Sequence, residues 1–319
     1  MAGLMIASLA GCVSTVLDVE QKAVQPIPAA VLATMKTKGM SPKSPVLVRI
    51  FKQESEFEVW KQDHTGRFAL LKTYPMCRWS GKLGPKMKSG DRQAPEGFYH
   101  VNAGMLNPAS QYYLSFNLGY PNRLESALGY SGEALMVHGA CSSSGCYALT
   151  DEGIGEIYSI VREALRGGQS SFQVQAFPFR MTAANMAANR NDRSFAFWQT
   201  LKTGYDAFEV TRRQPKVSYC ERRYVFDAQF ASEPTDPLAA CPPIAGAENP
   251  AVAMRAERDR SEMERLLAEG TAPTAYAYQD GGMHPSFRKV LQRNGEKALA
   301  KQTSLTKVPI SRPAAVLGN

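Results

Sequence analysis

The alternation of apolar and polar residues between positions 46 and 180 is the feature that most constrains the fold of this chain. Short runs with strand periodicity occur at residues 46–51, 57–60, 68–74, 98–101, 112–116, 134–138 and 171–177. One helical stripe interrupts them, with apolar residues three and four positions apart from Ile154 to Leu165. Thr150 or Asp151 would cap this helix and Gly167 would end it. The pattern predicts a mainly β domain at 46–180 with one helix near its end.

From residue 181 the periodicity becomes helical. The aromatic stretch at 195–208 has helical spacing, which is more typical of packing than of a ligand site. Residues 251–269 and 285–301 follow as a charged and a basic helix. The 319 residues suffice for about two domains. We therefore expect an α-helical C-terminal extension at 181–319, packed on the β domain.

The first twelve residues read MAGLMIASLAGC and end in a sequence similar to a bacterial lipobox, where a signal peptide is cut and Cys12 is lipidated. The apolar stretch is too short to span a bilayer, and no Lys or Arg precedes it. We expect a signal segment at 1–12, a loose tether at 13–45, and a periplasmic lipoprotein that contacts the membrane through its lipid anchor. A cytoplasmic enzyme with an accidental lipobox is the alternative.

The net charge of +8 is unevenly distributed. Residues 36–92 hold 13 Lys or Arg against 5 Asp or Glu, whereas residues 93–250 hold 12 against 15. Such an excess favours an anionic partner, although a solvated charged face explains it as well. The region lacks the interleaved aromatic residues of a single-strand nucleic-acid reader, so no nucleic-acid partner is predicted. A carboxylate-rich cell-wall polymer would fit the charge.

Residues 138–151 read HGACSSSGCYALTD and carry the strongest chemical signal. A strand delivers His138, a loop of small residues follows, and Cys146 stands just before a helix. A cysteine nucleophile needs a base, for which His is the usual side chain, and a nearby helix N-terminus lowers the pKa of a thiol. Small residues let backbone N–H groups converge as an oxyanion hole. A buried His and Cys without chemistry are the alternative.

Other site types need residues that this block lacks. A nucleophile elbow would need Gly where Cys141 stands. The H-x-E and P-C-x-x-C patterns of zinc deaminases and the phosphate loop are absent. A zinc site built from His138, Cys141 and Cys146 has no fourth ligand nearby in the sequence. The sequence therefore predicts neither a metal nor a cofactor.

Several segments, in order, resemble the L,D-transpeptidases with a YkuD-type catalytic domain, and among these the YafK-like branch. They are Pro85-Lys86 with Gly90-Asp91, PEGFY at 95–99, YLSFNLGYPN at 113–122, the block at 138–151, and FPFRM at 177–181. Residues 198–208 are similar to that branch too. The resemblance implies that residues 46–180 form a YkuD-like β-sandwich with one helix.

The resemblance also implies roles. Cys146 would be the nucleophile, His138 the general base, and the Gly139 carbonyl would orient the imidazole. The backbone N–H groups of Gly145 and Cys146 would form the oxyanion hole. The residues implied to bind the oxyanion or substrate are Ser144, Gly145, Tyr113, Lys86 and Arg92. The chain departs from much of the family at Ser144, where a second His is usual, and after Cys146, where Tyr-Ala-Leu replaces the usual Arg.

The family chemistry implies that the Cys146 thiolate attacks the meso-diaminopimelate carbonyl of a peptidoglycan stem peptide and forms a thioester. An amine would resolve it to a 3→3 cross-link or an attached lipoprotein, and water would release a wall-bound lipoprotein. The implied partners are stem peptides and a wall-linked outer-membrane lipoprotein. Carboxylates of the stem peptide would contact the basic loop, with Lys82, Lys86, Lys88 and Arg92. A non-catalytic peptidoglycan-binding lipoprotein is the alternative function.

An exported protein meets oxidising conditions, in which disulfides form. Cys220 and Cys241 are a candidate structural pair in the extension. Cys141 either packs as a small residue or pairs with Cys146 and masks it. Cys77 has no assigned role, and His64, His100 and His284 lack partners in the sequence.

Overall fold

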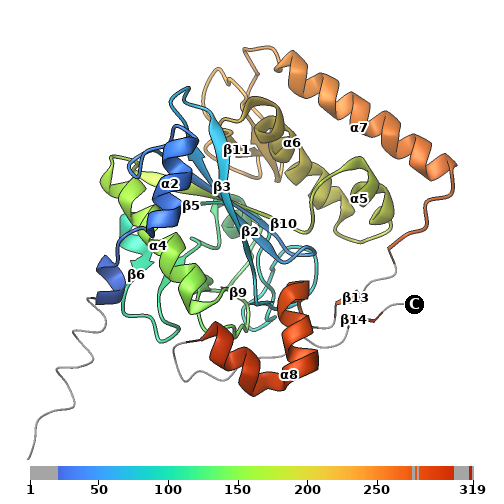
Figure 1. Cartoon of the computed structure of the whole chain (residues 1–319). Coiled ribbons are helices and arrows are strands. Elements are labelled where there is room, and N and C mark those ends of the chain that lie inside the picture. The colour runs from blue at the N-terminus through green and yellow to red at the C-terminus, as the bar shows by residue number, and fades with distance from the viewer. Residues whose placement is uncertain (1–20, 275–276, 279, 305–315, 318–319) are drawn as a thin grey trace, which may run out of the picture.

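The computed structural model describes residues 21–274, 277–278, 280–304 and 316–317, arranged as two five-stranded sheets with helices around them (Figure 1). The candidate lipobox and Cys12 lie outside the described residues. Within the described part, no helix has the length and apolar character needed to cross a membrane.

The first sheet has the strand order β3-β2-β1-β10-β5. Its strands are β1 (Val46–Phe51), β2 (Glu56–Gln62), β3 (Phe68–Pro75), β5 (Gly97–Asn102) and β10 (Ser171–Phe177). Only β1 and β10 run parallel, and the other neighbours are antiparallel. The central strand β1 is buried along its whole length, so both faces of this sheet are covered.

The second sheet has the order β4-β9-β8-β7-β6. Its strands are short: β4 (Arg78–Trp79), β6 (Leu106–Asn107), β7 (Ser115–Asn117), β8 (Met136–His138) and β9 (Tyr147–Ala148). Helix α4 (Asp151–Arg166) follows β9, and Thr150 caps it by accepting the Gly153 N–H at 2.9 Å. A short helix, α3 (Arg123–Ala127), lies between β7 and β8, and the 3-10 turn η1 (Ala103–Met105) joins β5 to β6.

One hydrophobic core joins both sheets to α4. It includes Val48 of β1, Val137 of β8 and Ile157 of α4. The rings of Phe116 on β7 and Phe172 on β10 meet edge to face, with centroids 5.5 Å apart. The prediction of a β-rich unit with one long helix at its end is confirmed at this level.

The extension covers the other face of the first sheet. Its elements are α5 (Ala183–Ala188), α6 (Phe195–Thr211), the hairpin β11 (Val217–Cys220) with β12 (Arg223–Phe226), and α7 (Pro250–Ala268). The Phe208 ring of α6 packs edge to face on Trp60, with centroids 5.1 Å apart. The aromatic stretch at 195–208 is therefore packing, as predicted, and the C-terminal helices are confirmed. Figure 1 shows α6 and α7 on the side of the molecule away from α4.

The last described elements are α8 (Pro285–Thr303) and the pair β13 (Ala277–Tyr278) with β14 (Val316–Leu317). Met283, Phe287 and Leu299 pack around Cys77 and Cys141. The C-terminal part of the chain therefore returns to the side of the second sheet that carries β9 (Figure 1).

The segment predicted as a loose tether is structured in its described part, so that prediction is wrong from residue 21 onward. Helix α2 (Ala29–Thr37) buries Val31 and Met35 in the main core. The Arg162 guanidinium on α4 donates to the carbonyls of Ala23 and Gln25, at 2.5 and 3.0 Å. This segment is ordered because buried apolar residues recur every four positions from Ile27, which is helical spacing. The prolines on either side of Ile27 obscured that pattern in the sequence.

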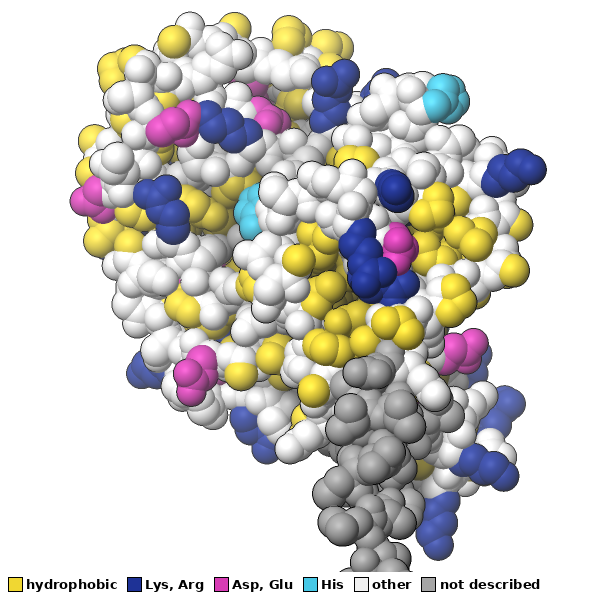
Figure 2. Space-filling view, turned by 90° about the vertical axis from the view of Figure 1, so that its left-hand side faces the viewer, with side chains coloured by type: hydrophobic (Ala, Val, Ile, Leu, Met, Phe, Trp, Pro, Cys, Tyr) yellow, Lys and Arg dark blue, Asp and Glu magenta, His cyan; other side chains and the backbone are white. Residues whose placement is uncertain are grey.

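The basic excess of residues 36–92 does not form one surface patch. Five of its cationic residues are buried: Arg49, Lys52, Lys61, Arg78 and Lys86. On the face shown in Figure 2, Lys and Arg side chains are scattered among uncharged ones. Much of the excess therefore serves internal ion pairs and hydrogen bonds, such as the Lys52–Glu96 pair at 2.8 Å.

Candidate active site

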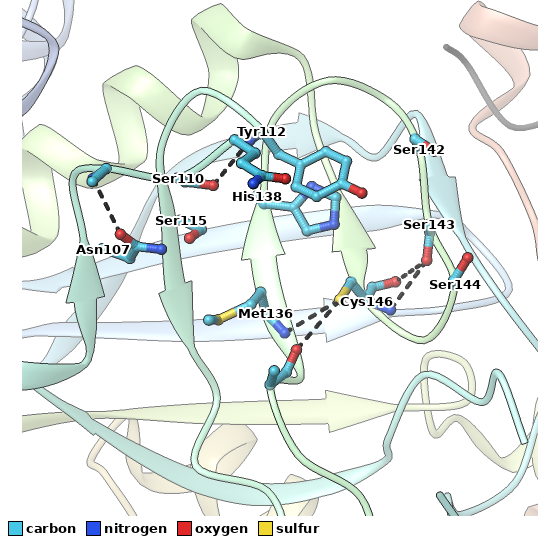
Figure 3. Close-up of a pocket in the computed structure, with 13 residues that line it drawn as sticks. Asn107, Ser110, Tyr112, Ser115, Met136, His138, Ser142, Ser143, Ser144 and Cys146 are labelled. Atoms are coloured by element: carbon cyan, nitrogen blue, oxygen red, sulfur yellow. Dashed lines mark hydrogen bonds between the residues drawn. The ribbon is translucent and has the colours of Figure 1, made fainter. Parts of the chain in front are cut away.

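Strands β8 and β9 bring His138 and Cys146 to one cavity. The strands are parallel, with His138 opposite Ala148, so Cys146 lies just before β9 and level with Met136. The Met136 N–H donates to Cys146 Sγ at 3.4 Å. Both side chains line a cavity of about 470 Å³ (Figure 3). The parallel pairing of β8 and β9 therefore brings His138 and Cys146 to the same cavity, although eight residues separate them in the sequence.

The His138 imidazole is held as a neutral base. Its Nδ1 lies 2.7 Å from the Gly139 carbonyl oxygen, and because a carbonyl only accepts, Nδ1 carries the proton. Nε2 is then the unprotonated nitrogen. Burial lowers the pKa of His138 to about 4, against a smaller opposing effect of the Gly139 hydrogen bond. The Tyr112 ring covers the imidazole, with centroids 4.6 Å apart (Figure 3).

Cys146 is the free thiol among the described cysteines. Burial raises its pKa, while the Met136 N–H and the positive charge of Lys86 act in the opposite direction. The resting site therefore holds a neutral thiol and a neutral imidazole, not an ion pair. In such a site the base takes the thiol proton as the sulfur attacks.

Ser143 organises the loop that carries Cys146. Its hydroxyl donates to the Cys146 carbonyl at 2.7 Å and accepts the N–H groups of Cys146 and Gly145 at 3.1 and 3.4 Å. Its Oγ also lies 3.0 Å from the hydroxyl of Ser80. The two N–H groups expected to form an oxyanion hole are thus engaged by Ser143 in this structure. Sequence reasoning missed Ser143 because a serine among serines carries no distinguishing signal.

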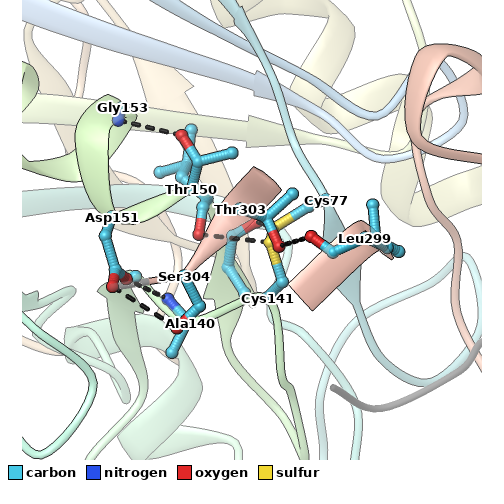
Figure 4. The surroundings of a disulfide bond; sticks show 12 residues. Cys77, Ala140, Cys141, Thr150, Asp151, Gly153, Leu299, Thr303 and Ser304 are labelled. Carbon is cyan, nitrogen blue, oxygen red and sulfur yellow. Dashed lines mark hydrogen bonds between the residues drawn. A yellow bond between two sulfur atoms is a disulfide. The ribbon is translucent and has the colours of Figure 1, made fainter. Parts of the chain in front are cut away.

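Cys141, in the loop between β8 and β9, forms a disulfide with Cys77 (Figure 4). Both predictions for Cys141, a packing thiol or a mask on Cys146, are wrong. The pairing was missed because 64 residues separate the partners and connectivity cannot be deduced from sequence. The second disulfide, Cys220–Cys241, is the predicted pair.

Asp151 fixes the same loop from the start of α4. Its Oδ1 accepts the Ala140 N–H at 2.7 Å (Figure 4). This oxygen and the Tyr112 backbone carbonyl would both lie too close to a Cβ on residue 139, which accounts for Gly139 at this position. Ala140 and Cys141 both have positive φ, 64° and 49°, which this contact and the disulfide hold in place. Asp151 was predicted only as a helix cap.

No family model matches the chain. It is 45% identical over 194 residues to YafK of Escherichia coli (strain K12), a protein provisionally named an L,D-transpeptidase; the match covers 61% of this chain and 78% of YafK. The same figures hold for YafK of Escherichia coli O157:H7. The chain belongs to the L,D-transpeptidase family, in its YafK-like branch.

Solved structures similar to this L,D-transpeptidase family member are remote. The cell-shape determining protein Pgp2 from Campylobacter jejuni is 16% identical, with a TM-score of 0.36, and the match covers 80% of this chain and 84% of Pgp2. Bd1075 of Bdellovibrio bacteriovorus is 13% identical, with a TM-score of 0.31, over 55% of this chain and 76% of Bd1075. At these scores the likeness carries no argument.

The cavity brings together only some of the residues that the L,D-transpeptidase resemblance implied. His138, Ser144 and Cys146 line it, with Gly139 behind the imidazole and Gly145 next to the nucleophile. Tyr113 is not among the lining residues, since its ring faces Gly155 of α4 and Lys22. Its neighbour Tyr112 takes the place expected for it. The strand begins only at residue 115, so the alternation assumed from 112 onward did not apply.

Lys86 and Arg92 are also outside this cavity. Lys86 is 4% exposed and bonds to Asp91 and to the Lys88 carbonyl, at 2.5 and 2.9 Å. Arg92 pairs with Asp280 at 3.1 Å. The positive charge of Lys86 nevertheless acts on the Cys146 thiol, and the expectation that Lys86 and Arg92 bind substrate stays a prediction.

Proposed function

We propose that this protein is a peptidoglycan L,D-transpeptidase-type cysteine enzyme that acts on the meso-diaminopimelate carbonyl of a stem peptide. The observation that carries the proposal is that the free thiol of Cys146 and the neutral imidazole of His138 line one cavity. The Nδ1–H of this imidazole donates to the Gly139 carbonyl, which leaves Nε2 free to accept a proton. The family membership supports the substrate class.

The proposed first step forms a bond between Cys146 Sγ and the carbonyl carbon while the thiol proton moves to His138 Nε2. His138 then protonates the leaving amine as the C–N bond breaks, and a thioester remains. In the second step an amine or a water attacks the thioester, His138 takes its proton, and the thiolate that leaves is reprotonated. Attack by an amine gives a 3→3 cross-link or an attached lipoprotein, and attack by water releases a wall-bound lipoprotein.

Digestion of purified sacculi with wild type and Cys146→Ala tests this proposal, with mass analysis of the muropeptides. New 3→3 dimers from wild type alone would establish a transpeptidase, and loss of attached protein or terminal residues without new dimers would establish a hydrolase of the same chemistry. Identical muropeptides from both proteins would overturn the proposal and favour the non-catalytic wall-binding alternative.

We also propose a periplasmic location with a lipid on Cys12. The two disulfides support export, because such bonds persist in oxidising compartments. Metabolic labelling with a fatty acid, compared between wild type and Cys12→Ser, tests it. Equal labelling of the two proteins, or none of either, would contradict the lipid anchor.

A further inference from the structure

A second, larger groove lies on another side of the loop at residues 80–97. It has a volume of about 910 Å³ and lies between residues 81–93 and the start of α6. Leu83, Pro85, Met87, Tyr130 and Phe197 supply its apolar walls. None of the residues that line the Cys146 cavity is among those that line this groove.

Three cations of this groove have no ion-pair partner among the described residues. Lys82 and Lys88 come from the loop, and Arg193 stands before α6. All three are exposed, whereas buried Lys52 and Lys86 are paired with Glu96 and Asp91. Unpaired cations from two distant segments that converge on one hollow create a positive potential that attracts anions.

The two acidic residues of the groove do not cancel this potential. Asp91 is paired with buried Lys86. Asp280 accepts from both Arg78 and Arg92, at 3.0 and 3.1 Å. Because two arginines share the single charge of Asp280, the groove keeps one positive charge there besides those of Lys82, Lys88 and Arg193. Its apolar walls would contact the uncharged part of a ligand.

The loop that lines the groove also approaches the Cys146 loop. The Gln93 side chain lines the groove and bridges the loop by bonding to the backbone of Lys82 and Gly84. The backbone carbonyl of Gln93 lies 4.0 Å from where a Cβ on Gly145 would stand, next to Cys146. Only the backbone of this loop would therefore separate a ligand in the groove from the segment that carries Cys146.

We propose that this groove binds a second, unreacted carboxylate-rich peptide arm of the wall polymer while another arm reacts at Cys146. The inference rests on the proposed function for the identity of the polymer. Charge complementarity selects the ligand class: a peptide with several carboxylates matches three free cations, and its aliphatic segments match the apolar walls. The groove would thus hold the enzyme on the wall without taking part in the chemistry.

The test uses a Lys82→Gln, Lys88→Gln, Arg193→Gln variant. Its matched control is Lys36→Gln, Arg213→Gln, Lys297→Gln, which removes the same charge from exposed sites outside the groove. Cys146 is first alkylated with N-ethylmaleimide in all proteins, which fills the catalytic cavity. Binding of a purified peptidoglycan tetrapeptide, and of the same peptide with its carboxylates amidated, is then measured by calorimetry at low and high salt.

We expect the groove variant to bind the free-acid tetrapeptide about tenfold more weakly than wild type at low salt, since each exposed ion pair contributes a factor of about two to five. The control variant and the wild type should bind equally, and the amidated peptide should bind weakly to all. Equal binding by the groove variant and wild type, or no binding by wild type, would overturn the proposal. Sacculus digestion by unmodified wild type and Cys146→Ala decides the proposed function separately.

Discussion

At the scale of single residues, the protonation of His138 sets the pH range of the proposed reaction. Burial lowers its pKa to about 4, so the imidazole stays a neutral base from neutral pH down to that value. We expect the acid limb of the kcat/KM profile on a soluble tetrapeptide to lie near pH 4 rather than near the ordinary histidine value of about 6.5. A limb near 6.5 would show that His138 is solvated in the working enzyme.

Asp151 is a positioning residue in this account, because it holds the Ala140 N–H next to the carbonyl that fixes His138. Asp151→Asn keeps an oxygen acceptor and should retain most of kcat. Asp151→Ala leaves the loop amide without its acceptor and should lower kcat strongly with a smaller change in KM, at a stability cost of about 1–3 kcal/mol. Steady-state kinetics and thermal unfolding of both variants test this. Equal kcat for Asp151→Ala and wild type would refute the positioning role.

Residue types and order made Cys146 and His138 candidates, because a cysteine nucleophile needs a base such as His, and the family resemblance assigned their roles. Tyr112, Ser143 and Cys77 were not predicted as site residues. The Ser143 hydroxyl binds within its own loop, among other serines. Tyr112 and Cys77 act through contacts across the fold: a ring over the imidazole, and a sulfur 64 residues from its partner. Such contacts leave no local pattern in the sequence.

At the scale of elements, the Cys77–Cys141 disulfide anchors the loop between β8 and β9 beside β4. A Cys77→Ser, Cys141→Ser variant should lose activity and about 2–5 kcal/mol of stability. The matched control is Cys220→Ser, Cys241→Ser, which removes the other disulfide, in the hairpin region of the extension. Both variants should be less stable, but only the first should change kcat of the soluble tetrapeptide reaction. If the two variants lose kcat equally, the disulfide has no specific effect on the site.

The central strands and the long helices were predictable to within a few residues, because the strand and helix periods are local. The short strands β4, β6 and β9 were not predicted, since two residues carry no period. Helix α2 was missed because it is only nine residues long and prolines precede it. Element type therefore followed from the sequence, while the sheet order that places β8 next to β9 did not.

At the scale of the whole molecule, buried Arg49 joins the first sheet to the extension. Its guanidinium pairs with Glu209 of α6 at 2.5 Å and lies 4.5 Å and 4.8 Å from the ring centroids of Tyr205 and Phe208. Its Nε and Nη2 atoms have no hydrogen-bond partner. The cation therefore depends on the Glu209 carboxylate and on two aromatic faces supplied by residues after 181, in addition to rings of the sheet itself such as Phe51.

This contact predicts that the β unit and the extension through α6 unfold together. Glu209→Gln removes the countercharge from a buried cation and should destabilise the protein by about 3–5 kcal/mol. An Arg49→Met, Glu209→Gln variant should regain part of that loss, because no unpaired buried charge remains. Urea unfolding can be followed by tryptophan fluorescence, because Trp60 reports on the sheet and Trp198 reports on α6. Each protein should show a single transition. Two separate transitions in wild type would mean that the extension is an independent domain.

The pH dependence of the same pair has a definite sign. Burial raises the pKa of Glu209, but the charge and hydrogen bond of Arg49 outweigh it, so the pKa lies below its ordinary value. The stabilisation is therefore present at neutral pH and is lost as the pH falls through this lowered pKa. The free energy of unfolding should drop more steeply below about pH 4.5 in wild type than in Arg49→Met, Glu209→Gln, which lacks the titrating carboxylate. Parallel curves for the two proteins would show that this ion pair does not couple the sheet to α6.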